Sequence, residues 1–153
     1  AAQGNSYLAR FRAVAKRYPM VAPADILADL IKTTPGDEGK WFATAKDLRL
    51  YDLALQLADQ SPCEPKTLTR AARDFIESEP TFAFGAAMAA LRWLNEGWGY
   101  EVTGMDVIDA YELALAAAER SRIDNVLDQI RALLDQAKGA GNAFVRQSLA
   151  RRL

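Results

Sequence analysis

Four short stretches of the chain place a hydroxyl side chain three positions before a carboxylate, a spacing that suits two kinds of chemistry. The oxygens of such a pair can ligate a bound molecule. They can also begin a helix, because a Ser or Thr at the N-cap accepts a backbone hydrogen bond and the carboxylate accepts one from the cap. In two stretches proline follows the hydroxyl residue, as is common in a first helical turn. We therefore interpret all four as helix starts: Thr34-Pro-Gly-Asp37, Ser61-Pro-Cys-Glu64, Thr103-Gly-Met-Asp106 and Ser121-Arg-Ile-Asp124.

The chain has no histidine and one cysteine, which narrows the catalytic chemistry. Imidazole-based triads and His-ligated metal sites are excluded, and one thiol cannot form a disulfide within the chain. A carboxylate site for Mg²⁺ or Ca²⁺ stays open, but no EF-hand-like loop is present. Cys63 follows Pro62 at an expected helix start, where the dipole could lower the thiol pKa. Without a histidine partner we interpret Cys63 as structural, and we expect no metal ion and no cofactor.

The composition is that of a soluble globular protein. Half of the 153 residues are hydrophobic, a quarter are charged and the net charge is −1, so no global charge attracts nucleic acid or anionic membrane. The length suits a single domain covering residues 1–153. The most apolar run, residues 81–94, contains Arg92 and is shorter than the roughly 20 residues of a membrane span. The first residues have no signal-peptide pattern, so we expect a cytoplasmic chain that does not bind a membrane.

Apolar residues recur with a helical period along most of the chain. In residues 6–18 they fall at i, i+1, i+4, i+7, i+8 and i+11, which is one stripe of a 3.6-residue period. Hairpin turns and alternating β-branched runs are nearly absent. The predicted helices cover residues 6–18, 23–31, 35–46, 48–60, 65–78, 80–96, 105–121, 123–138 and 144–153.

The fold class is therefore all-α. Short connections make consecutive helices antiparallel neighbours, so we expect helical hairpins stacked as a short irregular α-solenoid. A compact multi-helix bundle of the same helices is the alternative.

Several side chains are candidates for binding a partner. Lys40 precedes two aromatic residues and lies near Gly36 and Gly39, two glycines that suggest close approach of a neighbouring backbone or of a ligand. In the helix expected at residues 65–78, Arg70 and Arg73 lie four positions before Asp74 and Glu77. They form either solvated i,i+4 ion pairs or an Arg-lined recognition face.

Trp98 and Tyr100 lie in the glycine-rich connection that follows the apolar helix. An indole between two glycines either folds back onto the core or belongs to a binding surface. We predict the first, with Trp98 packed near Val102, Val107 and Tyr111.

Basic residues gather at both ends of the chain, where they could contact phosphates. A solvated face is the alternative, and it is favoured because the whole chain is slightly acidic. The first helix carries four cations, and the chain has no acid before Asp25: the cations are Arg10, Arg12, Lys16 and Arg17. The C-terminal segment carries Lys138, Arg146, Arg151 and Arg152.

Three stretches, GKWFATAKD, SPCEPKTLTRAARDF and ALRWLNEGWGYEVTGMDV, resemble segments of an uncharacterised family of bacterial helical proteins. The resemblance covers nearly the whole chain. It implies that this region is the C-terminal part of a longer protein, which agrees with the missing initiator Met. It implies no activity, cofactor or catalytic residue. In pattern the hairpins also resemble tetratricopeptide and HEAT-type repeats, although no segment matches the full tetratricopeptide consensus.

Three hypotheses of function follow. The leading one is a helical-repeat interaction module that binds a protein or peptide partner in a groove between hairpins. The second is a domain that binds nucleic acid through its basic terminal helices. The third is a HEAT-like enzyme acting on nucleic acid through acidic and aromatic side chains, for which the candidates are Asp106, Asp109, Glu112, Trp98 and Tyr100.

Overall fold

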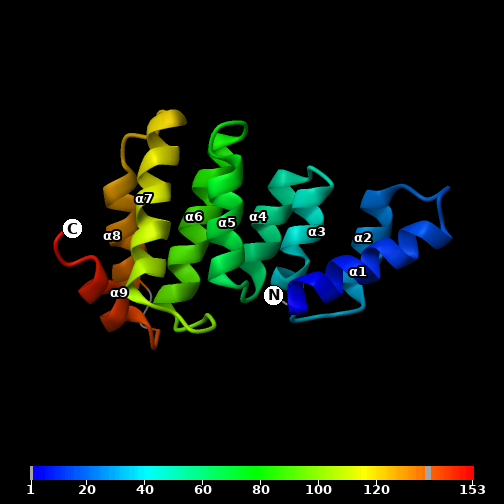
Figure 1. Cartoon of the computed structure of the whole chain (residues 1–153), viewed down its shortest axis with the longest axis horizontal. Helices are drawn as coiled ribbons and strands as arrows, with labels where there is room; N and C mark the ends of the chain where they lie inside the picture. Colours follow the sequence, from blue (N-terminus) through cyan, green and yellow to red (C-terminus); the bar gives the residue numbers. More distant parts are fainter. Residues whose placement is uncertain (1, 137–138) are drawn as a thin grey trace. The chain divides into compact units, whose positions relative to one another are not determined.

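The computed structural model describes residues 2–136 and 139–153, and within these ranges the chain is helical without strands (Figure 1). The predicted all-α class is confirmed. The chain divides into two compact units, residues 1–62 and 63–153, which we describe separately. None of the helices in the described ranges is both long and apolar enough to cross a membrane.

The described residues of the first unit, 2–62, form four α-helices and one 3-10 helix. Its elements are α1 (Ala2–Arg17), α2 (Pro23–Lys32), η1 (Glu38–Trp41), α3 (Phe42–Asp47) and α4 (Tyr51–Gln60). Pro23 begins α2, because a residue without an N–H costs nothing in a first helical turn. Leu27, Trp41, Phe42 and Leu57 are fully or almost fully buried and form the core of this unit. The prediction of one helix over residues 35–46 is wrong in detail, since a 3-10 turn comes first and α3 starts only at Phe42.

Gly39 explains why this segment is irregular. Its N–H donates to Ser61 Oγ at 2.7 Å, and a Cβ at this position would lie 2.5 Å from the carbonyl oxygens of Ser61 and Pro62. Such a distance leaves no room for any side chain. A close backbone approach is therefore present at Gly39, where the approaching group is the segment that follows α4 and not a helix. It is absent at Gly36, where an added Cβ would have no atom within 4 Å.

The second unit is built around α6. Its helices are α5 (Pro65–Phe75), α6 (Pro80–Asn95), α7 (Gly104–Arg120), α8 (Val126–Gln136) and α9 (Asn142–Ser148). Figure 1 shows α5, α6 and α7 side by side, and α6 packs against both of its neighbours. The contact faces of these three helices are rich in fully buried alanines: Ala71, Ala72, Ala83, Ala86, Ala87, Ala90, Ala110, Ala114 and Ala117. Small side chains allow the helices to approach closely, so α6 and its neighbours form the core.

A hydrogen-bonded pair of amide side chains, Asn95 and Asn142, fastens α9 to this core. Asn95 is fully buried at the end of α6, and its Oδ1 accepts a hydrogen bond from Asn142 Nδ2 at 2.8 Å. Asn142 Nδ2 also donates to the carbonyl oxygen of Leu134 at 3.0 Å. Because one side chain bonds to both α6 and α8, it fixes the start of α9 beside the end of α6.

Only one of the four hydroxyl–carboxylate stretches begins a helix as predicted. Thr103 and Asp106 form a capping box at the start of α7, in which the Asp106 carboxylate accepts from the Thr103 N–H at 2.7 Å. The prediction is wrong for the other three hydroxyls, which lie at helix C-termini. Ser61 and Ser121 end α4 and α7, while Thr34 follows α2 and bonds back to the carbonyl oxygen of Ile31.

The capping difference is directly measurable. Thr103→Ala removes a cap, so we expect it to lower the free energy of unfolding by about 1 kcal/mol. Ser121→Ala removes only an exposed contact with Thr81, so we expect a change within about 0.5 kcal/mol. Urea denaturation of the two variants compares them, and equal losses would contradict this assignment of the helix starts.

Candidate functional site

The connection between α6 and α7, residues 96–103, combines a fixed backbone with exposed aromatic side chains; we call it the aromatic loop. It begins with a helix-terminating turn at Gly97, whose φ of 91° is left-handed. In this turn the Trp98 N–H donates to the carbonyl oxygen of Trp93 at 2.9 Å, and the Gly97 N–H donates to that of Leu94 at 3.0 Å. These two bonds define the turn that commonly ends a helix at glycine.

Side chains from the start of α5 hold the middle of the aromatic loop. Lys66 Nζ donates to the carbonyl oxygens of Tyr100 and Glu101 at 2.8 and 3.2 Å. Glu64 Oε1 accepts from the Tyr100 N–H at 3.4 Å and also from the Lys66 N–H at 3.5 Å. Gly99 has a φ of 124°, and any Cβ there would collide with Val102. Since the Thr103 cap fixes the other end, the loop backbone is constrained along its whole length.

The large side chains of this constrained segment nevertheless face solvent. Trp98 is 52% exposed and Tyr100 is 72% exposed, and Met105, in the first turn of α7, is 59% exposed. The prediction that Trp98 packs into the core is therefore wrong. Val107 and Tyr111, its expected neighbours, are both buried. Gly97 and Gly99 both have a positive φ, so they set the backbone turn at Trp98 as the sequence suggested, but the Trp98 side chain lies at the surface.

Trp, Tyr and Met are residue types enriched at protein interfaces. An indole held by a rigid loop loses little conformational entropy when a partner covers it, so it is suited to act as a binding anchor. Two of the three carboxylates that the enzyme hypothesis named are engaged in structure, and the third, Glu112, is exposed on α7. Asp106 caps α7, and Asp109 pairs with Arg73 at 4.0 Å. In the described ranges, no cluster of His, Cys, Asp and Glu has a composition suited to hold a metal ion.

The other candidates on α5 differ from the predicted ion pairs. Arg73 contacts Asp109 of α7 instead of Glu77, which pairs with Arg120 at 2.9 Å. Arg70 is exposed and has no ion pair in the described part of the chain. Arg70 and Arg73 thus lie on α5, whereas Trp98 and Tyr100 belong to the aromatic loop, and an Arg-lined recognition face on α5 stays a prediction.

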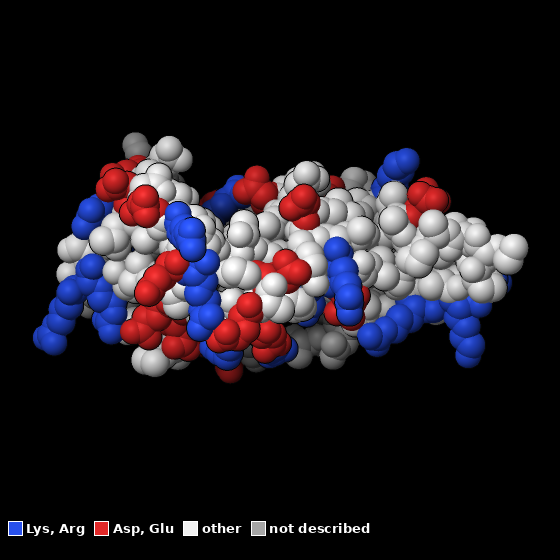
Figure 2. Space-filling view, turned by 90° about the horizontal axis from the view of Figure 1, so that it is seen from above, with Lys and Arg blue, Asp and Glu red and all other residues white. Residues whose placement is uncertain are grey.

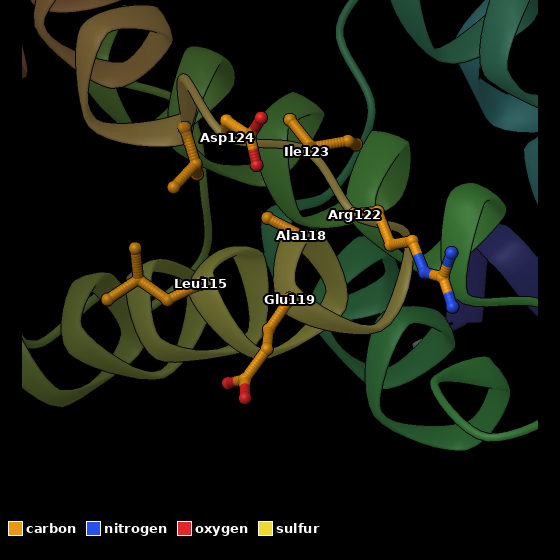
Figure 3. A pocket seen from close by; sticks show the side chains of 7 residues that line it. Leu115, Ala118, Glu119, Arg122, Ile123 and Asp124 are labelled. Carbon is orange, nitrogen blue, oxygen red and sulfur yellow. The ribbon is translucent and has the colours of Figure 1, made fainter.

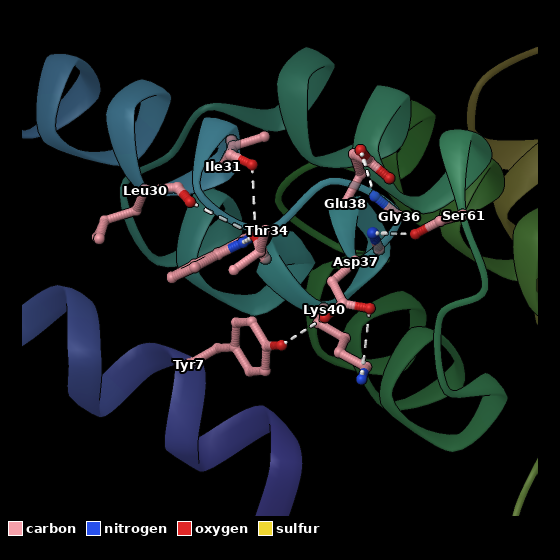
Figure 4. Close-up of polar contacts among 11 residues, drawn as sticks. Tyr7, Leu30, Ile31, Thr34, Gly36, Asp37, Glu38, Lys40 and Ser61 are labelled. Atoms are coloured by element: carbon pink, nitrogen blue, oxygen red, sulfur yellow. Dashed lines mark hydrogen bonds and ion pairs between the residues drawn. The ribbon is translucent and has the colours of Figure 1, made fainter.

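Lys40 belongs to a polar network inside the first unit (Figure 4). Its Nζ lies 3.6 Å from Asp37 Oδ1 and 5.8 Å from the centroid of the Tyr7 ring. The Tyr7 hydroxyl donates to Asp37 Oδ2 at 2.9 Å. Burial, and then this bond to a carboxylate, raise the pKa of Tyr7. Lys40 thus has structural partners on two sides within its own unit.

The basic residues of α1 do not share one face. Arg10 lies over the rings of Tyr7 and Trp41 at 5.4 and 5.5 Å from their centroids, and Arg12 pairs with Asp47 at 3.5 Å. Lys16 and Arg17 are exposed at the end of the helix. Figure 2 shows Lys and Arg side chains projecting from the right-hand end, where α1 lies. Two of the four cations are thus occupied by contacts within the unit.

At the other end of the chain, Arg146 pairs with Asp135 at 2.7 Å, and Arg151 and Arg152 are exposed. Lys138 lies outside the described residues.

Cys63 is buried, and burial followed by the neighbouring Glu64 charge raises its pKa to about 12. The thiol pKa is therefore raised, and not lowered as the position near a helix start allowed. The protonated, buried thiol is a poor nucleophile, in agreement with the structural interpretation.

An open pocket of about 630 Å³ lies where α7 ends and α8 begins (Figure 3). Its charged lining residues are Glu119, Arg122 and Asp124, whose side chains extend in different directions. Without convergent polar groups this pocket has no catalytic arrangement. The sequence analysis did not identify this pocket. It also did not identify Met105, although its predicted place in the first turn of a helix was a sequence signal for it.

No protein-family model matches the chain, and the comparisons with curated proteins and with solved structures gave no match. The resemblance to a bacterial helical family therefore stays a prediction.

The exposure of Trp98 predicts two results that differ from those of a core tryptophan. Trp98→Ala should lower the free energy of unfolding by less than about 1 kcal/mol, whereas Trp93→Ala, at a buried site, should lower it by about 3–5 kcal/mol. Trp41 and Trp93 are both buried, so Trp98→Phe should remove most of the tryptophan fluorescence that iodide quenches. A Trp98→Ala loss as large as that of Trp93→Ala would contradict the exposed position.

Proposed function

We propose that the chain is a helical interaction module that binds a protein or peptide partner at the aromatic loop. The observation that carries this proposal is the combination of exposed Trp98 and Tyr100 side chains with a backbone held by Glu64 and Lys66. Exposed aromatic residues on a mobile loop would lose much of their binding energy in being ordered. On a fixed loop they offer a preorganised apolar surface, which is the form that binding hot spots take.

The surface around the loop extends this apolar area. Met105 is exposed in the first turn of α7, and Phe144 is exposed on α9. The two helices are near neighbours here, because a Cβ at Gly104 would lie 3.5 Å from Ser148 Oγ. Ser148 is one helical turn beyond Phe144 and donates to its carbonyl oxygen at 2.8 Å. We therefore include Met105 and Phe144 in the proposed surface.

The architecture that we propose for this module is a short, irregular α-solenoid of antiparallel hairpins. The successive packing of α5, α6 and α7 in the second unit supports it. Solenoids present extended surfaces and connecting loops to their partners. Nucleic-acid binding through α1 has less support, because contacts within the first unit occupy Arg10 and Arg12.

Selection from a displayed library of linear peptides tests the proposal while the natural partner is still unidentified. Peptides selected on the wild-type chain should bind the Trp98→Ala/Tyr100→Ala variant at least about tenfold more weakly, since truncating a hot spot costs about 2 kcal/mol or more. Arg70→Ala is the matched control, because Arg70 is exposed in the same unit without an ion pair in its described part. Affinities would be measured by fluorescence anisotropy.

Selected peptides that bind the double variant within about twofold of wild type, while the variant stays folded, would contradict the proposal. The folded state would be checked by circular dichroism and by urea denaturation. Failure to enrich any peptide that depends on Trp98 would count against the proposal in the same way.

A further inference from the structure

The first unit has a second apolar surface, a groove between α1 and α2 that its own residues leave open. The groove has a volume of about 290 Å³. Ile26 forms part of the buried core beneath it, while Tyr18 is 54% exposed at its edge. The apolar lining residues are Val14, Tyr18, Val21, Ile26 and Leu30, and the polar ones are Asp29 and Thr33.

The turn between α1 and α2 adds to this surface. It carries Met20, which is 96% exposed, and Val21, which is also exposed. Pro19 and Pro23 lie on either side of these residues and fix φ at both positions, and the Val21 N–H donates to the carbonyl oxygen of Tyr18 at 3.1 Å. The turn therefore has a set conformation that does not depend on burying its apolar side chains. Several large apolar groups exposed together mark an interaction surface.

The size of the groove indicates what fits into it. Small-molecule pockets commonly have volumes of about 300–1,000 Å³ and enclose most of the ligand; this groove, with about 290 Å³, is at the lower end of that range and is open to solvent. An open groove between two helices suits the apolar side chains of a third, amphipathic helix, which inserts anchors at positions i, i+3 or i+4, and i+7.

The charged residues beside the groove indicate which charges the polar face of a bound helix would carry. The described part of α1, residues 2–17, carries four cations and no acid. Arg17 lies three positions after the groove residue Val14, so both are on the same side of α1. Arg17 is exposed and has no ion pair within the described ranges. Lys16 lies two positions from both Val14 and Tyr18, which places it on the opposite side.

On the α2 side the groove has the opposite charge. Asp29 is exposed and lines it, and Asp25 lies one turn earlier on the same helix. The two sides therefore present charges of opposite sign to anything lying between them. Such an arrangement favours one orientation of a charged partner and disfavours the other.

We infer that the groove between α1 and α2 is a docking site for an amphipathic helix of a protein partner, with acidic residues on the edge that meets Arg17. This site is independent of the aromatic loop, because it is formed entirely by residues of the first unit. A second copy of the chain and a nucleic acid are the competing occupants, and the test separates them.

The probe is a displayed library of helical peptides with leucine at positions i, i+4 and i+7. Its flanking positions vary among Glu, Lys and Ser, and it is selected on the whole chain. We expect Glu to be enriched along one edge of the selected helices. Tyr18→Ala/Val21→Ser alters two exposed side chains, so the fold is retained, and it should weaken the selected peptides by about tenfold or more. Trp98→Ala should leave their affinity within about twofold, since Trp98 belongs to the other unit and shares no partner with the groove residues.

Exchanging charges between the chain and the peptide tests the predicted orientation of the bound helix. Arg17→Glu should weaken an acidic peptide severalfold, and replacing the facing Glu of the peptide with Lys should restore binding. Lys16→Glu is the matched control: it makes the same charge change at the neighbouring position, on the opposite side of α1. It should produce a smaller loss, and the Lys-containing peptide should not rescue it.

Four results would overturn the inference. One is a selection without acidic enrichment, and a second is unchanged binding to the folded Tyr18→Ala/Val21→Ser variant. A third is an equal effect of Lys16→Glu and Arg17→Glu, which would indicate a general field such as one attracting nucleic acid. The fourth is a dimer, detected by light scattering, that Tyr18→Ala/Val21→Ser dissociates, because a second copy would then occupy the groove. Each of these leaves the aromatic-loop proposal intact, since that depends on Trp98.

Discussion

Close packing of small side chains around α6 is the constraint on which the second unit depends. Ala83, Ala86, Ala87 and Ala90 are all fully buried, and alanine gives α6 a narrow contact surface on which α5 and α7 can lie closely. Leu91 and Trp93, in the last turns of the helix, are also buried. A close-packed interior accepts no further large group without strain. A second indole from the connection therefore lies outside the core, on the surface.

The same packing brings the start of α5 to the aromatic loop, where polar contacts take over. Lys66 supplies an ammonium group to two successive carbonyl oxygens, and Glu64 accepts from the loop backbone. Backbone groups bonded in this way cannot turn freely to bury the side chains that they carry. The fixed backbone and the exposed aromatic residues are thus two consequences of one arrangement. The apolar groove in the first unit has a different origin, because prolines fix its turn.

Much of the fold follows from the sequence, because helical periodicity is local information. The all-α class and most of the helices agree with the predicted ranges. Helix ends were harder to predict. Thr34, Ser61 and Ser121 have the side chain of a cap, but their partners are an upstream carbonyl, a glycine 22 positions away and a threonine 40 positions away. The spacing of a hydroxyl and a carboxylate within four residues cannot show which of these partners lies nearest to the hydroxyl in the fold.

The candidate site was predictable only in part, for the same reason. The sequence singled out Trp98 and Tyr100 by their glycine-rich surroundings, but the direction of Trp98 depends on how the core near Trp93 is filled. Lys40 and Arg73 looked available as isolated cations, whereas Asp37 and Asp109 approach them in the fold. The groove beside Tyr18 was missed because Tyr18 fits the apolar stripe of α1. Its exposure becomes evident only once the position of α2 is known.

Backbone dynamics of the aromatic loop test the central claim, that a fixed backbone presents exposed aromatic side chains. The most direct measurement is ¹⁵N NMR relaxation of the amides of residues 97–103, together with solvent exchange of the Trp98 indole N–H. The account predicts order parameters near the value of about 0.85 that is typical of rigid backbone, with an indole N–H that exchanges rapidly with water. Order parameters below about 0.6, the range of flexible segments, or an indole N–H protected like that of Trp93, would contradict it.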